Sequence, residues 1–228
     1  MGDPQQIRRW HAYATPDTLI EAAAADIMQN ADAAVGKTGS FRIVLAGGNT
    51  PKALYRKLRH MNAKWDAWEI YFGDERCLPP DHPERNSSMA LDAWLSHVPI
   101  PMSRIHVIPA ELGPEAGASS YARILKDAGK FDLVLLGLGE DGHTASLFPG
   151  KKWGDRDAFP VFDAPKPPSE RISMSASRLG FADGVFFLVS GESKRQAVTD
   201  WRSGKPIPAS GIIPSSGIDI FIESFLIE

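Results

Sequence analysis

A polar loop at residues 137–149 contains a carboxylate and an imidazole two positions apart. Asp141 and His143 lie in this loop among glycines, and the loop follows the apolar run 131–136. Such a run is typical of a buried strand in a parallel sheet, and open α/β sheets bind ligands at the carboxyl ends of their strands. A carboxylate can orient or charge a nearby histidine, which moves protons near neutral pH. The loop therefore predicts a proton-transfer site. The alternative is a capping or surface histidine in a glycine-rich turn.

A second loop has the order of residues that suits a bound anion. Gly47, Gly48, Asn49 and Thr50 follow an apolar segment and precede an expected helix. Backbone N–H groups at the start of a helix, together with the helix dipole, attract phosphate. The alternative is a tight turn in which Asn49 or Thr50 caps the helix. The P-loop lysine and the G-x-G-x-x-G spacing are both missing, so a nucleotide is not indicated.

Two cations follow other expected strands. Arg76 comes after the segment 68–72, and Lys194 comes after the segment 185–190. An arginine can hold a phosphate or carboxylate through two parallel hydrogen bonds. The alternatives are that Arg76 forms a weak surface pair with Asp74 or Glu75, and that Lys194 is an exposed helix lysine.

Asn86 and Ser87 end the polar loop that follows Arg76. Asparagine and serine are favoured at helix N-caps. We therefore expect these two residues to cap the next helix.

Alternation of apolar and helical segments indicates the fold. Expected strands span 41–46, 68–72, 104–108, 131–136, 172–175, 185–190 and 218–222, and expected helices span 17–35, 52–60, 89–97, 115–129 and 192–202. Segments 73–88 and 150–169 read as loops. Strands that alternate with helices predict a mainly parallel, doubly wound sheet in a three-layer α/β/α, Rossmann-like arrangement. We expect residues 1–228 to form a single domain of this kind.

Composition narrows the classes of partner. The net charge is −3, which gives no electrostatic reason to expect nucleic acid or an acidic membrane surface. The only cysteine is Cys77, so an internal disulfide and a cysteine-rich zinc site are excluded, and no other metal-ligand spacing occurs. No apolar run approaches a membrane span, and no apolar core follows Arg8 and Arg9. We expect a cytoplasmic protein without metal or cofactor.

The chain resembles the 6-phosphogluconolactonases, within the broader glucosamine-6-phosphate isomerase/deaminase group. The resemblance rests on four ordered motifs, at 46–51, 73–76 with Pro79 and 86–87, 137–149, and 189–194. Deaminases of that group carry a glutamate after the Asp-Gly-His sequence, whereas Thr144 to Pro149 contains no acid here. This difference favours the lactonase branch. The pattern often has serine where this chain has Asn49, and threonines where it has Ser173 and Ser175, and all three replacements keep the polarity.

The resemblance implies hydrolysis of 6-phospho-D-glucono-1,5-lactone to 6-phosphogluconate in the oxidative pentose phosphate pathway. It implies that His143 activates water with help from Asp141, and that amides of 137–142 stabilise the oxyanion. It further implies that Arg76, Lys194 and the 47–50 loop hold the 6-phosphate. No metal or cofactor is implied.

The alternatives are a glucosamine-6-phosphate deaminase/isomerase-like enzyme and a non-catalytic phosphosugar-binding protein. The expected partner is a small phosphosugar lactone, with neither nucleic acid nor membrane, and the expected state is a monomer or weak homodimer.

Overall fold

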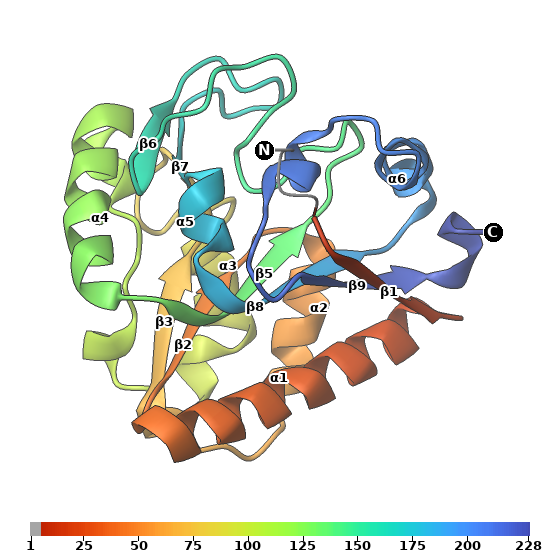
Figure 1. The fold of residues 1–228 in the computed structure, drawn as a ribbon. Coiled ribbons are helices and arrows are strands. Elements are labelled where there is room, and N and C mark those ends of the chain that lie inside the picture. The colour runs from red at the N-terminus through yellow and green to blue at the C-terminus, as the bar shows by residue number, and fades with distance from the viewer. Residues whose placement is uncertain (1–5) are drawn as a thin grey trace.

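The computed structural model describes residues 6–228 and contains a six-stranded parallel sheet (Figure 1). Its order is β1-β9-β8-β5-β2-β3, and every neighbouring pair is parallel. The strands are β1 (Arg8–Tyr13), β2 (Phe41–Leu45), β3 (Trp68–Phe72), β5 (Phe131–Gly137), β8 (Ala182–Val189) and β9 (Ile218–Glu223). β5 lies inside the sheet and is almost wholly buried, as its apolar sequence predicts.

Helices cover both faces of this sheet. They are α1 (Pro16–Thr38), α2 (Asn49–Leu58), α3 (Asn86–Ala93), α4 (Pro114–Ala128), α5 (Ala176–Gly180) and α6 (Arg195–Arg202). α1 runs along one face with α2 beside it, while α5 and α6 lie on the opposite side (Figure 1). Trp201 of α6 packs edge-to-face on Phe187 of β8 at 4.8 Å between ring centroids. The expected α/β/α layering is confirmed.

The start of α1 follows directly from local sequence. The Thr15 hydroxyl accepts a hydrogen bond from the Thr18 amide at 3.2 Å, and Pro16 occupies the first turn. Gly39 ends the helix in the left-handed region, with a φ of 80°. A side-chain cap, an early proline and a final glycine are typical helix boundaries.

The direction of chain winding reverses between β2 and β5. β2 has β3 on one side and β5 on the other, and from β5 the chain continues outward through β8 and β9. Crossover connections on the two sides of such a point diverge, which leaves a crevice at the carboxyl ends of the two strands. The loops that leave β2 and β5 border this crevice.

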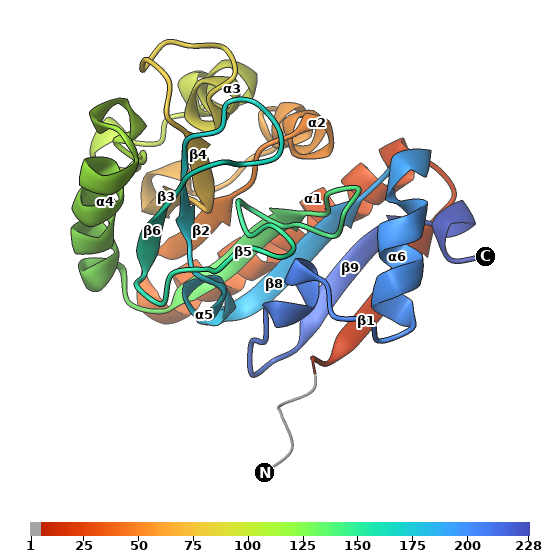
Figure 2. The same cartoon turned by 90° about the horizontal axis from the view of Figure 1, so that it is seen from above.

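A small antiparallel sheet stands beside the β3 end of the main sheet (Figure 2). It contains β4 (Asp74–Arg76), β7 (Arg171–Met174) and β6 (Ala158–Val161), in the order β4-β7-β6. The sequence indicated loops at 73–88 and 150–169, so β4 and β6 were not predicted. Both are short and lack a long apolar run, which leaves little periodic signal.

Two other details differ from expectation. Residues 104–108 form no strand, because Met102–Arg104 is a 3₁₀ turn and only Ile105 bridges to Ile70 of β3. β1 was not predicted, because it is an edge strand with several charged or polar residues.

Within residues 6–228, no helix has the length and apolar character needed to cross a membrane.

The outer edge of β3 is closed by a tyrosine. The Phe72 amide donates to the Tyr121 hydroxyl at 2.9 Å, and this hydroxyl donates to the Phe72 carbonyl at 3.1 Å. Tyr121 lies on α4 and is fully buried. One hydroxyl therefore satisfies two backbone groups that a neighbouring strand would otherwise pair.

We expect Tyr121→Phe to lower the free energy of unfolding by about 1–3 kcal/mol, because two buried backbone groups lose their partner. Urea denaturation followed by circular dichroism measures the loss. Tyr13→Phe is the matched control, since no hydrogen bond of that hydroxyl is found among residues 6–228 and its effect should stay within about 0.5 kcal/mol. Equal stability of the two variants would contradict this role for Tyr121.

Candidate active site

A cavity of about 310 Å³ lies at the crevice between the carboxyl ends of β2 and β5. Its walls include Gly47 and Gly48 after β2, residues 137–139 and 143–145 at the end of β5, and Arg76 from β4. Lys194, on the 3₁₀ turn Glu192–Lys194 that follows β8, completes the predicted set. The structure thus brings residues from four separate sequence motifs to one cavity.

Asp141 holds one nitrogen of the His143 ring. His143 Nδ1 lies 2.5 Å from Asp141 Oδ1, and the His143 amide donates to the same oxygen at 3.1 Å. Burial opposes the charge on Asp141, but these hydrogen bonds outweigh it, so the pKa of the carboxyl group lies below its ordinary value. An ionised Asp141 accepts a hydrogen bond from the Nδ1–H group of His143. This leaves the lone pair on His143 Nε2, which has no hydrogen-bond partner among residues 6–228.

Packing fixes the plane of the His143 ring. The ring lies against Phe148, at 4.8 Å between centroids, and the His143 side chain is 20% exposed. A Cβ at Gly139 would fall 2.0 Å from His143 Nδ1, so only glycine leaves room for the imidazole there. The alternative of a surface or capping histidine does not describe this side chain.

Two amides of the 137–142 segment are already occupied within the loop. Gly139 donates to the His143 carbonyl at 2.7 Å, and Gly142 donates to the Gly139 carbonyl at 3.0 Å. The expectation that this whole segment offers amides to an oxyanion is therefore wrong for Gly139 and Gly142. Their hydrogen bonds instead keep the loop closed around His143.

Gly47 allows Asn86 to pack closely, and Gly48 leads into α2 without a side-chain cap. A Cβ at Gly47 would lie 2.0 Å from Asn86 Oδ1. Gly48 precedes α2 with a φ of 107°, and no side chain caps the helix. No side chain caps α2, so the cap alternative fails for Asn49 and Thr50. Asn49 is exposed and neither residue is among those that line the cavity, so their contact with a phosphate stays a prediction.

Arg76 is not in a surface pair with a neighbouring acid, and Lys194 is not a fully exposed helix lysine. Arg76 Nη1 donates to the Glu84 carbonyl at 2.5 Å, and its side chain does not pair with Asp74 or Glu75. Lys194 lines the cavity, where burial lowers the pKa of its ammonium group despite the nearby charge of Glu140. Both cations can therefore meet a ligand in the cavity.

Asp74 is a cavity residue to which the sequence assigned no role. It is 6% exposed, and its Oδ2 accepts from Ser146 Oγ at 2.6 Å while its Oδ1 accepts from Asn86 Nδ2 at 3.0 Å. This carboxylate joins the loops after β3 and β5 to the start of α3. Its place directly after an expected strand was the only sequence signal for it.

Lys166 and Arg171 also line the cavity and were not predicted. Lys166 lies in the connection between β6 and β7, and Arg171 is the first residue of β7. Their sequence surroundings are rich in proline and were read as a loop excursion. Only the pairing of β7 with β4 brings this segment to the cavity.

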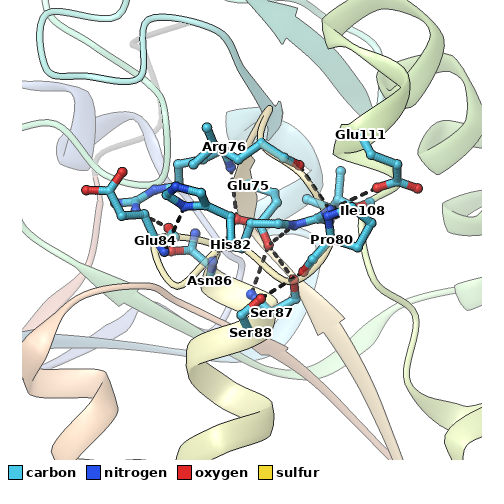
Figure 3. A network of polar contacts seen from close by, with 12 residues as sticks. Glu75, Arg76, Pro80, His82, Glu84, Asn86, Ser87, Ser88, Ile108 and Glu111 are labelled. Carbon is cyan, nitrogen blue, oxygen red and sulfur yellow. Dashed lines mark hydrogen bonds and ion pairs between the residues drawn. The ribbon is translucent and has the colours of Figure 1, made fainter.

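Glu75 organises the chain next to Arg76 (Figure 3). Its fully buried carboxylate accepts from the amides of Arg76, Asn86 and Ser87 at 2.7–2.9 Å, and from the Ser87 hydroxyl at 2.7 Å. α3 begins at Asn86 and has no capping side chain at Arg85. The expectation that Asn86 and Ser87 cap this helix is wrong, because Glu75 on β4 accepts the hydrogen bonds of their amides.

Arg85 supports this carboxylate from behind. Arg85 Nε lies 3.5 Å from Glu75 Oε2, while Nη1 donates to Glu111 at 2.9 Å and Nη2 to the Ile108 carbonyl at 2.7 Å. Arg85 is 2% exposed. A buried ion pair of this kind is costly to break one-sidedly.

We expect Glu75→Gln to lower the free energy of unfolding by about 3–5 kcal/mol, because the amide NH₂ would face donors and Arg85 would lose its buried counter-charge. Thermal and urea unfolding measure the change. Glu111→Gln is the matched control: it removes the other, partly exposed partner of Arg85 and should cost much less. Similar losses for both variants would contradict a special position of Glu75.

No group of three or more histidine, cysteine, aspartate or glutamate side chains within residues 6–228 is arranged to hold a metal ion.

Comparison with known proteins assigns the chain to a family. The family model described as "Glucosamine-6-phosphate isomerases/6-phosphogluconolactonase" matches residues 14–221. A 6-phosphogluconolactonase of Nostoc sp. is 38% identical over 199 residues, which cover 80% of this chain and 81% of the relative. The GDH/6PGL endoplasmic bifunctional protein of Oryctolagus cuniculus is 37% identical over 222 residues, 90% of this chain but only 28% of that protein.

The fold agrees with this assignment. A crystal structure of 6-phosphogluconolactonase from Thermotoga maritima superposes with a TM-score of 0.87 at 26% identity, covering 95% of this chain and all of that one. The residues that the family model matches include every residue that lines the cavity. This chain belongs to the glucosamine-6-phosphate isomerase/6-phosphogluconolactonase family.

Proposed function

We propose that this protein hydrolyses 6-phospho-D-glucono-1,5-lactone to 6-phosphogluconate, the lactonase step of the oxidative pentose phosphate pathway. The observation that carries the proposal is the free Nε2 of His143, oriented through Asp141, beside a cavity that several cations line. The names of the Nostoc and Thermotoga relatives support the same reaction.

His143 acts as the general base and then as the general acid. Nε2 takes a proton from a water molecule as its oxygen attacks C1 of the lactone, which gives a tetrahedral intermediate. The bond between C1 and the ring oxygen then breaks, and His143 returns the proton to the departing oxygen. Ionised Asp141 stabilises the imidazolium between the two steps. The lactone carbonyl is already electrophilic, so no covalent nucleophile is needed.

The phosphate lies away from the reacting carbon. Arg76 and Lys194 supply charge, and the uncapped start of α2 after Gly48 supplies amide N–H groups. Binding energy from this remote group holds the carbonyl against His143.

The deaminase alternative lacks its acid. Thr144 to Pro149 carries no carboxylate. Among residues 6–228, Asp74 is the one acid that lines the cavity, and its two oxygens are bonded to Ser146 and Asn86. A protein that only binds phosphosugars would not need the Asp141–His143 pair. Both observations favour the lactonase.

Loss of the lactone, followed with and without the protein, tests the proposal. The readout is NADP reduction by the dehydrogenase that consumes 6-phosphogluconate, after subtraction of the spontaneous rate. Acceleration is expected. An unchanged rate with retained 6-phosphogluconate binding would establish a binding protein, and ammonia release from glucosamine 6-phosphate would establish the deaminase.

We expect His143→Ala to reduce kcat by roughly two to four orders of magnitude while retaining most of the affinity for 6-phosphogluconate, since the lost group moves protons. Steady-state kinetics and calorimetry separate the two quantities. His60→Ala, at an exposed position in the turn that follows α2, is the control and should behave as wild type. Near-normal turnover by folded His143→Ala would remove this residue from the mechanism.

We expect Arg76→Ala and Lys194→Ala to lower kcat/KM much more for the phosphorylated lactone than for unphosphorylated gluconolactone, chiefly through KM. The reason is that only the phosphorylated substrate offers a group to these cations. Measuring kcat/KM for both lactones in each variant decides the matter. Equal losses on the two substrates would mean that these residues serve the chemistry or the fold.

A further inference from the structure

Arg171 holds its guanidinium rigidly at the wall of the cavity. It is 5% exposed, with Nε donating to the Pro168 carbonyl at 3.0 Å and Nη2 donating to the carbonyls of Lys166 and Pro167 at 2.9 and 3.3 Å. Nη1 has no hydrogen-bond partner among residues 6–228, and it is not among the unpartnered polar atoms that are shielded from solvent. One edge of a pre-oriented donor group therefore remains free at a cavity-lining residue.

Arg171 lies directly opposite another arginine. In the antiparallel pair of β4 and β7, Arg76 is the partner of Arg171, and both line the cavity. Like charges directly opposite each other on neighbouring strands are unfavourable. Burial lowers the pKa of Arg171. The charge of Arg76 acts in the same direction, while the nearby charge of Asp74 opposes both.

The nearby acids do not form ion pairs with these two arginines. Asp74 is bonded to Ser146 and Asn86, and the Glu75 carboxylate is bonded to the start of α3. Within residues 6–228, neither Arg76 nor Arg171 has a carboxylate within ion-pairing distance. An anion bound between them would relieve the repulsion of both.

Phe148 relates this arginine pair to the catalytic histidine. Its ring lies 4.8 Å from the His143 ring and 5.7 Å from Arg171 Cζ, so the two groups can be no further apart than these distances combined. Because both residues also line the same cavity, one ligand can contact Arg171 and His143 together.

We propose that Arg171 and Arg76 bind the same phosphate group, and that Arg171 is a specificity-determining residue for phosphorylated lactones. This inference rests on the proposed function. Arg171 donates from the free edge of its guanidinium to one phosphate oxygen. Arg76 supplies a second positive charge from the neighbouring strand. Two guanidinium groups favour an anionic group such as phosphate, which unphosphorylated gluconolactone does not have.

Calorimetric titration with 6-phosphogluconate and with inorganic phosphate tests this directly, because it needs no turnover. We expect Arg171→Gln to weaken 6-phosphogluconate binding by about 10- to 100-fold, the range typical of a charge-assisted hydrogen bond. Arg171→Lys keeps the charge but loses the fork, so an intermediate loss is expected, and it remains informative if the glutamine variant folds poorly. In kinetics, both variants should lose more on the phosphorylated lactone than on gluconolactone.

Arg178→Lys is the matched control. Arg178 is equally buried and donates to backbone carbonyls, but it does not line the cavity. Phosphate affinity should be unchanged in this variant. A similar loss in Arg178→Lys would show a general effect of removing a buried guanidinium, and would overturn the proposal.

A double-mutant cycle with Arg76→Gln and Arg171→Gln decides whether the two residues share one ligand group. Groups that bind the same phosphate couple, so the fold-losses of the single variants should not multiply in the double variant. Independent losses, or equal losses on both lactones, would overturn the proposal. A wild-type protein that binds phosphate through this pair without hydrolysing the lactone would overturn the proposed function alone.

Discussion

The reversal of winding between β2 and β5 is the constraint on which the site depends. Because the chain leaves these adjacent parallel strands toward opposite edges of the sheet, their connecting loops separate and a crevice opens between them. One loop brings the glycine pair that precedes α2, and the other brings Asp141 and His143. Residues about a hundred positions apart thus line one cavity.

The sheet alone does not place the arginines, and a buried carboxylate completes the arrangement. Glu75 lies just beyond β3, where the chain leaves the main sheet, and it binds the start of α3 through two amides and a hydroxyl. This fixes β4, whose pairing with β7 sets Arg76 beside Arg171. The strand order thus positions the loops, the Glu75 carboxylate positions β4, and β4 with β7 positions the arginines at the cavity.

The sequence was informative wherever a long periodic segment or a strand-end motif was present. The apolar run before Asp141 and the capped, alanine-rich α1 were predictable because burial and local capping act over short stretches. β6 was not, since this four-residue strand has no long apolar run, and β4 was not, since its partner β7 lies far along the chain. Arg171 was missed for the same reason, and the capping of α3 was misassigned because its acceptor, Glu75, lies eleven residues upstream of Asn86.

The contact of Gly47 with Asn86 limits how this enzyme family member can change over evolution. A side chain at Gly47 would displace the Asn86 amide, which holds Asp74, which in turn anchors Ser146 in the loop after β5. A single added methyl group would thus disturb three loops at once. Lys166, by contrast, lines the cavity with a side chain that is 56% exposed and forms a surface ion pair with Glu140, so a substitution there leaves this series of contacts intact.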